Sequence, residues 1–134
     1  MRNSFGKTAV GKAIIAAFLA AIFLKLLVFD FMVAEGHSMA PVIQPGNIII
    51  VCKIFYGIRL PLSGTYLVRW RTPQAGDIVV FFTPLGEIAV KRSTEILPGE
   101  RFMALGDNSY QSYDSRNYGP VPFDNIIGRV LFRR

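Results

Sequence analysis

Residues 76–90 read GDIVVFFTPLGEIAV, and this stretch decides the fold. It holds two short apolar runs rich in β-branched and aromatic residues, 78–82 and 88–90, with Gly and Pro beside them. Runs of this length between turn residues are typical of strands rather than helices. Similar runs lie at 48–51, 102–105 and 126–132, again separated by Gly and Pro. No helix-length periodicity follows residue 35, so the sequence predicts a mostly β domain over residues 35–134.

An apolar segment precedes this domain. Residues 13–34 are apolar except for Lys25 and Asp30, and they exceed the roughly 20 residues that a membrane-spanning helix needs. The segment could be a cleaved secretory signal, a buried core helix or an uncleaved anchor. No convincing Ala-x-Ala cleavage site precedes the domain, which favours the anchor. Arg2, Lys7 and Lys12 come first, so the positive-inside rule predicts that residues 1–12 are cytoplasmic and residues 35–134 lie outside.

The charge of the chain limits its partners. The 134 residues carry a formal net charge of +6, and much of the excess lies at the two ends. No dense stripe of Lys and Arg is interleaved with aromatic residues, which argues against a nucleic-acid partner. Basic residues beside an apolar segment instead favour contact with the anionic headgroups of a lipid bilayer. Within the segment, Lys25 and Asp30 could snorkel, lie at the outer interface or face protein.

Cysteine and histidine are too few for a disulfide or a zinc site. Cys52 is the one cysteine, so no intramolecular disulfide can form, and its apolar neighbours predict a buried small side chain. Together with His37 it offers too few ligands for zinc, so the sequence predicts no metal and no cofactor.

Ser38 and Lys91 are the candidates for catalysis. Ser38 stands between Gly36 and Pro41 directly after the apolar segment, where an ordinary turn serine is the plain alternative. Lys91 ends an apolar run, and burial there would lower its pKa from the usual value of about 10.4. A neutral lysine amine can take the proton of a serine hydroxyl, whereas a solvated lysine at a strand end cannot. His37 is a poor base for Ser38, because neighbouring side chains on an extended backbone point to opposite faces.

The segment 106–119 is dense in Gly, Asp, Asn and Ser, which are typical of exposed turns. A second interpretation is a polar scaffold for the site. Asp114 and Arg116 are two positions apart, so on an extended stretch they share a face and can form a charge-assisted pair. Ser112 would lie on the same face, where it could hold a lysine amine in place.

Four segments in this order resemble the conserved boxes of bacterial type I signal peptidases, peptidase family S26. They are Ser38-Met39-Ala40-Pro41, Gly76-Asp77-Ile78-Val79-Val80-Phe81, Lys91-Arg92, and the stretch from Gly106-Asp107-Asn108 through Asp114-Ser115-Arg116 to Gly119. The resemblance implies a signal-peptidase-like β core behind one N-terminal transmembrane helix. The segment between residues 91 and 106 is short, which implies a minimal version without the family's usual insertion.

The resemblance also implies a role for each site residue. Ser38 would be the nucleophile and its backbone N–H an oxyanion donor, and Lys91 would be the general base of a Ser/Lys dyad. The supporting residues are the serine that orients the lysine amine, the structural ion pair, a further acid and two substrate contacts: Ser112, Asp114 with Arg116, Asp107, and Met39 with Gly36.

The implied activity is that of a membrane-bound serine endopeptidase that removes signal peptides from secreted preproteins, with small residues in an Ala-x-Ala pattern before the cut. The implied location is the bacterial cytoplasmic membrane, crossed once, with the catalytic domain on the extracytoplasmic side. Two alternatives stay open: a conjugation-pilin maturation peptidase of the same superfamily, and an inactive membrane-tethered β module that binds peptides. The box around Asp114 and the anchor favour the signal peptidase over the first, and the retained Ser38 and Lys91 argue against the second.

Overall fold

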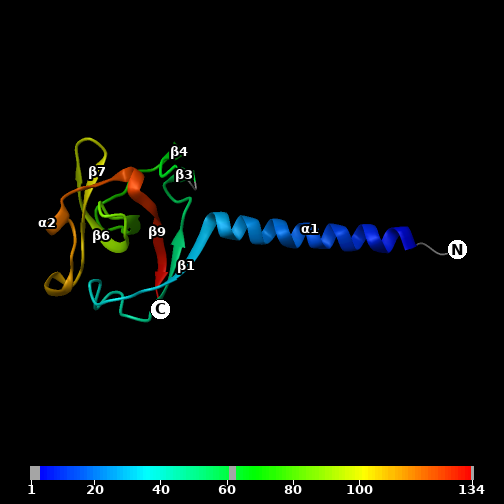
Figure 1. The fold of residues 1–134 in the computed structure, drawn as a ribbon, viewed down its shortest axis with the longest axis horizontal. Helices are drawn as coiled ribbons and strands as arrows, with labels where there is room; N and C mark the ends of the chain where they lie inside the picture. The colour runs from blue at the N-terminus through cyan, green and yellow to red at the C-terminus, as the bar shows by residue number, and fades with distance from the viewer. Residues whose placement is uncertain (1–3, 61–62, 134) are drawn as a thin grey trace.

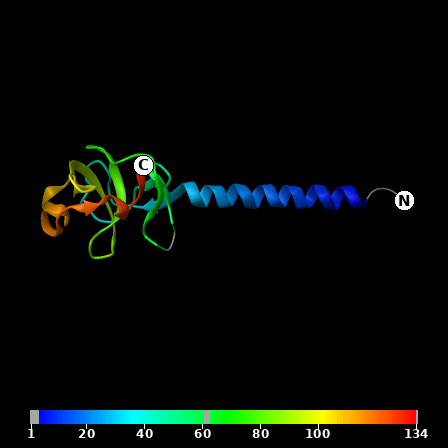
Figure 2. The same ribbon diagram turned by 90° about the horizontal axis from the view of Figure 1, so that it is seen from above.

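The computed structural model describes residues 4–60 and 63–133. A long helix projects from one side of a small β domain (Figure 1), and the view from above shows the same arrangement (Figure 2). Arg2, one of the three basic residues that the predicted orientation uses, lies outside the described residues.

Helix α1 spans Ser4–Val28. Its stretch Thr8–Val28 is long and apolar enough to cross a membrane, and none of its most apolar window is buried within the protein. Large apolar side chains therefore face outward all along it; Phe18 and Phe23, for example, are 66% and 67% exposed. A helix of this length that is apolar all round and packs against no other described part of the protein could span a membrane. The prediction of one N-terminal helix of this kind is confirmed.

The predicted boundary of the anchor at residue 34 differs from the structure, in which the helix ends at Val28 and strand β1, Phe29–Val33, follows at once. Strand β1 pairs antiparallel with strand β2, Ile48–Cys52, in the register that sets Asp30 opposite Val51. This pairing supplies hydrogen-bond partners for the backbone N–H and C=O groups of the residues that follow the helix. It also keeps the Asp30 carboxylate out of a helix in hydrocarbon, where a charged side chain would cost free energy. Lys25 lies 4.9 Å above the ring of Phe31, so its charge also lies at the junction of helix and strand.

The β domain is one curled antiparallel sheet of seven strands in the order β1-β2-β9-β5-β6-β7-β8, with a separate two-stranded sheet, β3-β4. The mostly β prediction is confirmed, and all five expected runs are strands. The run at 88–90 begins a longer strand than expected, and the hairpin β3-β4 and the short β8 were not predicted. The remaining bounds are β3 Gly57–Arg59, β4 Tyr66–Arg69, β5 Ile78–Phe82, β6 Ile88–Leu97, β7 Arg101–Leu105, β8 Val121–Pro122 and β9 Ile126–Arg133.

Two apolar clusters lie on the two faces of β5. Val79 and Phe81 belong to a cluster with Phe102, whereas Ile78 and Val80 belong to a second cluster. Because side chains alternate along a strand, an unbroken apolar run such as 78–82 is suited to a strand buried on both faces. Truncating Phe81 or Phe102 to alanine would cost about 3–5 kcal/mol of stability. Cys52 is buried and unpaired, as predicted.

Candidate active site

The segment that follows β1 carries Ser38 into an open groove. Gly36 precedes it with a φ of +75°, a left-handed conformation that glycine adopts without strain. A backbone hydrogen bond from Ile43 to Met39 closes the turn behind the serine, at 2.8 Å. Met39 is buried while Ser38 remains partly accessible, so the turn presents the hydroxyl and anchors its neighbour in the core.

Lys91 approaches Ser38 from strand β6. Its Nζ donates a hydrogen bond to the Ser38 Oγ at 2.7 Å. The side chain is 6% exposed, and its direct cross-strand neighbour is Val79, a fully buried residue of the apolar core. Burial lowers the pKa of the Lys91 amine, while the charge of Asp114 opposes that shift in part. The sequence placed this lysine at the end of an apolar strand; the structure instead buries it within strand β6, which continues past it to Leu97.

Asp114 is the centre of the polar network behind this pair. Its buried carboxylate accepts hydrogen bonds from the Ser112 hydroxyl at 2.5 Å and from the Gly106 N–H at 2.8 Å. Arg116 donates two more from Nε and Nη2, at 2.9 and 2.6 Å. Burial alone would raise the pKa of Asp114, but the bonds from Arg116, Gly106 and Ser112 hold it well below its usual range.

The Asp114–Arg116 pair forms in a helical turn and not on the extended stretch that the sequence suggested. Asp114 is the N-cap of the short helix α2, Ser115–Tyr118, and its side chain accepts from the Arg116 N–H. The Ser112 hydroxyl is directed to Asp114 by its hydrogen bond. The serine expected to hold the lysine amine thus binds the carboxylate whose charge acts on that amine.

Gly106 allows the close contact between this network and the serine segment. A Cβ at this position would overlap the Ser112 side chain and lie only 2.6 Å from the Ser38 carbonyl oxygen. The next residues continue the attachment, because the Asn108 N–H donates to the same Ser38 oxygen at 2.9 Å. Asp107 in turn binds Arg92 through two hydrogen bonds of 2.8 Å. Adjacent residues of β6 therefore contact the serine and the loop that holds it.

The groove around Ser38 and Lys91 has a volume of about 440 Å³ and two walls. One wall is the segment 32–39, from β1 to the serine turn, and the other is the segment 83–91, from the β5-β6 connection to Lys91. Strand β1 lies at the edge of the sheet. On β6, pairing with β7 begins only at Arg92, so residues 88–90 pair on their β5 side. The groove thus runs between two strand edges.

A family of known proteins matches this chain over nearly its full length. The family model described as signal peptidase, peptidase S26, matches residues 7–94 and 87–134. The chain belongs to the peptidase S26 family of signal peptidases. This confirms the resemblance that the four boxes indicated.

Individual relatives of this signal peptidase family member come from bacteria and from plant organelles. Signal peptidase I of Bacillus caldolyticus is 29% identical over 82% of this chain and 81% of its own length. A mitochondrial ATP-independent inner membrane protease subunit 1b of Arabidopsis thaliana is 30% identical over 98% of this chain and 88% of its own. A probable signal peptidase I-2 of Synechocystis sp. is 26% identical over 92% and 71%.

In this signal peptidase family member, the sequence candidates gather in one place. Ser38 contacts Lys91, and Ser112 and Arg116 contact Asp114, while Asp107 is joined to Arg92 beside the base candidate. Gly36 and Met39 line the groove. Within residues 4–60 and 63–133, no group of three or more His, Cys, Asp or Glu side chains could hold a metal ion.

Sequence reasoning missed several residues of the groove. Glu35, Glu87, Leu85, Tyr113 and Tyr118 also line it. Their positions within or near the four boxes were a usable signal, because neighbours of a candidate site residue often share its surface. The role of Gly106 as a close-approach glycine had no such signal, since it depends on two segments that are distant in sequence.

Proposed function

We propose that this protein is a membrane-bound serine endopeptidase that removes signal peptides from preproteins, with Ser38 as nucleophile and Lys91 as general base. The observation that carries the proposal is the 2.7 Å distance between the Lys91 Nζ and the Ser38 Oγ, in surroundings that lower the lysine pKa. A hydroxyl and a partly desolvated amine at hydrogen-bond distance meet the geometric requirement for proton transfer. Membership of the signal peptidase family supports the reaction class.

The proposed reaction begins with neutral Lys91, which accepts the proton of the Ser38 hydroxyl as the oxygen attacks the scissile carbonyl. The backbone N–H of Ser38 donates to the oxyanion that forms. Lys91 then gives its proton to the leaving amine as the C–N bond breaks. Water, deprotonated by the same amine, attacks the acyl ester and regenerates the serine hydroxyl.

We further propose that the substrate binds in an extended conformation between the two walls of the groove. Strand β1 and residues 88–90 both offer backbone groups on the edge of the sheet, and an added strand can pair with such groups. Buried Met39 and Ile43 line the groove, so in this proposal they give short substrate side chains an apolar surface near Ser38. This supports small residues before the cut, as in an Ala-x-Ala pattern, with Met39 and Gly36 as contacts.

The remaining site residues act as positioning residues in this proposal. Asp114 and Arg116 fix the loop, and Ser112 fills the space between the carboxylate and Gly106. Asp107, bound to Arg92, holds the same loop against the strand of the base. None of them touches the reacting atoms, so each influences the rate through the position or the pKa of Lys91 and Ser38.

The proposed topology follows from the helix and the basic N-terminus: residues 1–12 in the cytoplasm, and the domain after α1 on the extracytoplasmic side of a bacterial cytoplasmic membrane. Tyr110 is 99% exposed and Cys52 is buried, which gives a clean test. In a Cys52→Ala background, Tyr110→Cys should react with a membrane-impermeant maleimide in intact cells. Labelling that requires lysis would contradict this orientation.

The test of the activity uses the full chain in detergent and a purified preprotein. The wild type should release the signal peptide at one bond, identified by N-terminal sequencing of the product. Ser38→Ala and Lys91→Ala should each abolish release while the circular dichroism spectrum is unchanged. Binding of the preprotein without cleavage by the wild type would favour an inactive peptide-binding module, and cleavage of a pilin precursor alone would favour a pilin maturation peptidase.

A further inference from the structure

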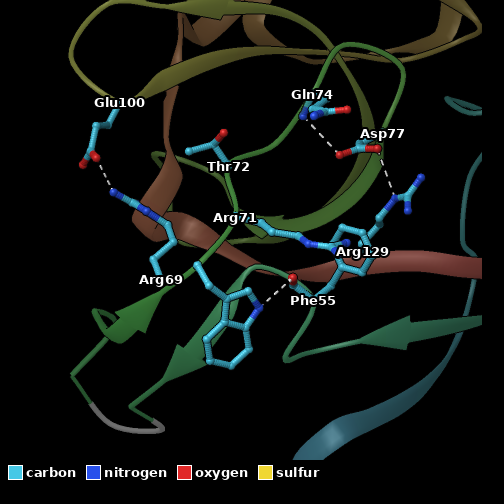
Figure 3. A pocket seen from close by; sticks show the side chains of 9 residues that line it. Phe55, Arg69, Arg71, Thr72, Gln74, Asp77, Glu100 and Arg129 are labelled. Atoms are coloured by element: carbon cyan, nitrogen blue, oxygen red, sulfur yellow. Dashed lines mark hydrogen bonds and ion pairs between the residues drawn. The ribbon is translucent and has the colours of Figure 1, made fainter.

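A second cleft lies away from the groove and plays no part in the proposed reaction. It has a volume of about 720 Å³ and opens between β4, the segment that leads to β5, and β9 (Figure 3). Arginine side chains and aromatic rings dominate its lining. The lining residues are Phe55, Arg69, Trp70, Arg71, Thr72, Gln74, Asp77, Glu100 and Arg129.

The charges of this cleft leave one arginine available. Arg129 pairs with Asp77 at 3.1 Å, and Arg69 pairs with Glu100. Among the described residues, no ion pair joins Arg71 to a carboxylate. Arg69 also pairs with Asp124, which lies just outside the lining, so among the described residues the exposed Arg71 is the one arginine of the cleft whose charge has no carboxylate partner.

Aromatic rings hold these cations in place. The guanidinium carbons of Arg71 and Arg129 lie 5.0 and 4.6 Å from the centre of the Phe55 ring. Stacking of this kind fixes the plane of a guanidinium while its edge keeps N–H donors free, which suits phosphate oxygens. Trp70 is half exposed and its indole N–H donates to the Phe55 carbonyl at 3.2 Å. An exposed tryptophan held in this way is typical of the membrane–water interface.

The position of the cleft relative to the helix sets its depth. The Lys53 N–H donates to the carbonyl of Val28, the last residue of α1, at 2.8 Å. Phe55 lies two residues further along, so at roughly 3.3 Å per residue it lies within about 10 Å of the helix end. If α1 spans the roughly 30 Å hydrocarbon core, the headgroup layer begins at that end and extends about 5–8 Å outward. The Phe55 end of the cleft therefore lies within the headgroup layer or directly next to it.

We propose that the cleft lined by Phe55, Trp70 and Arg71 binds the phosphate of an anionic phospholipid in the membrane that holds α1. Arg71 supplies the charge and the donors, Arg129 supports it across the Phe55 ring, and Trp70 lies beside the glycerol and the upper acyl chain. The site is independent of the catalytic proposal, because it shares no lining residue with the groove of Ser38 and Lys91.

The chain contains a single tryptophan, so the emission of Trp70 reports on this cleft alone. The full chain in neutral maltoside micelles is titrated with dioleoylphosphatidylglycerol, with dioleoylglycerol, which has the same acyl chains and no phosphate, and with inorganic phosphate. We expect a saturable change in emission with phosphatidylglycerol alone. Arg71→Gln should weaken that response about fivefold, the contribution of one basic residue near an anionic surface.

Two matched variants make the result decisive. Arg101→Gln removes the same charge from an exposed residue at the start of strand β7, outside the lining of the cleft, and should leave the response unchanged. Ser38→Ala, which abolishes the proposed cleavage, should bind lipid like the wild type. The proposal is overturned by equal weakening in Arg101→Gln, which indicates diffuse attraction to a basic protein, or by an equal response to dioleoylglycerol. It is also overturned if inorganic phosphate gives the same change at the same concentration.

Discussion

The side-chain amine of Lys91 lies 2.7 Å from the hydroxyl of Ser38, although 53 positions separate the two residues in sequence. Each comes from a different wall of the groove. The loop after β7 joins the walls, since Asn108 binds the Ser38 carbonyl and Asp107 binds Arg92 next to the lysine. The contact therefore depends on three separate segments, and each can be tested.

Replacing Lys91 by arginine separates charge from basicity. A guanidinium keeps a positive charge and a similar length, but it does not lose its proton at any accessible pH. Lys91→Arg should therefore lower kcat for preprotein cleavage by about a hundredfold to ten-thousandfold, as loss of a general base does. His37→Ala, a change at the exposed neighbour of the serine, should stay within a few-fold of the wild type in the same assay. A similar loss in both variants would contradict the assignment of the base.

The pH dependence of kcat/KM should report the lysine. In the proposed reaction cleavage requires the neutral amine, so kcat/KM should rise with pH and level off above the pKa of Lys91, which burial holds below the ordinary value of about 10.4. Because the Asp114 charge raises that pKa, Asp114→Asn should move the midpoint to lower pH. Asp124→Asn, a change at an exposed carboxylate outside the groove, should leave it in place. A midpoint at or above 10.4 in the wild type would argue against a desolvated base.

Because of the Asp114 network, the free energy of unfolding should fall as the pH is lowered into the acid range. A carboxylate with a lowered pKa stabilises the folded state fully above its unfolded pKa of about 3.9, and that contribution is lost as pH falls toward the folded value. Asp114→Asn should lower the free energy of unfolding by about 2 kcal/mol at pH 7, because charged hydrogen bonds are lost. Its stability should also vary less than that of the wild type below pH 4 or so. The measurement is the melting temperature in detergent, followed by circular dichroism at a series of pH values. An equal pH dependence in the wild type and in Asp114→Asn would show that Asp114 does not contribute to the loss of stability in acid.

Gly106 tests the close approach of the loop to the serine. A methyl group there meets the Ser112 side chain and the Ser38 carbonyl, so Gly106→Ala should push the serine segment away from Lys91. A misplacement of about 1 Å can cost on the order of a hundredfold in rate, and we expect a loss of that size in kcat. Gly11→Ala is the size-matched control, because nothing lies within 4 Å of the added methyl group. Full activity in Gly106→Ala would show that the loop can move without displacing the serine.

The sequence predicted the parts of this structure that depend on local pattern. The unbroken run at 78–82 indicated a strand, and the four boxes indicated the family. It could not predict where the helix ends. Residues 29–33 continue the apolar run apart from Asp30, and their pairing with β2 makes them a strand.

In the candidate site, too, the sequence predicted residues but not their geometry. Asp114 and Arg116 were expected as a pair, but their helical turn and the Ser112 bond to Asp114 depend on capping geometry that the spacing alone does not specify. The arginine cleft had no sequence signal. Its residues come from four distant segments, around Phe55, Arg71, Glu100 and Arg129, and the fold alone assembles them.

Helix α1 passes into β1 with no residue between them, and the bond from Lys53 to Val28 closes the joint. Because this junction has no flexible linker, the distance of Ser38 from the bilayer surface is fixed. A preprotein would then be cut where its extended chain reaches that distance, counted outward from the end of its own apolar segment. Bond selection would thus depend on depth as well as on side-chain size, and inserting a flexible spacer after Val28 would blur the cutting position without altering the chemistry.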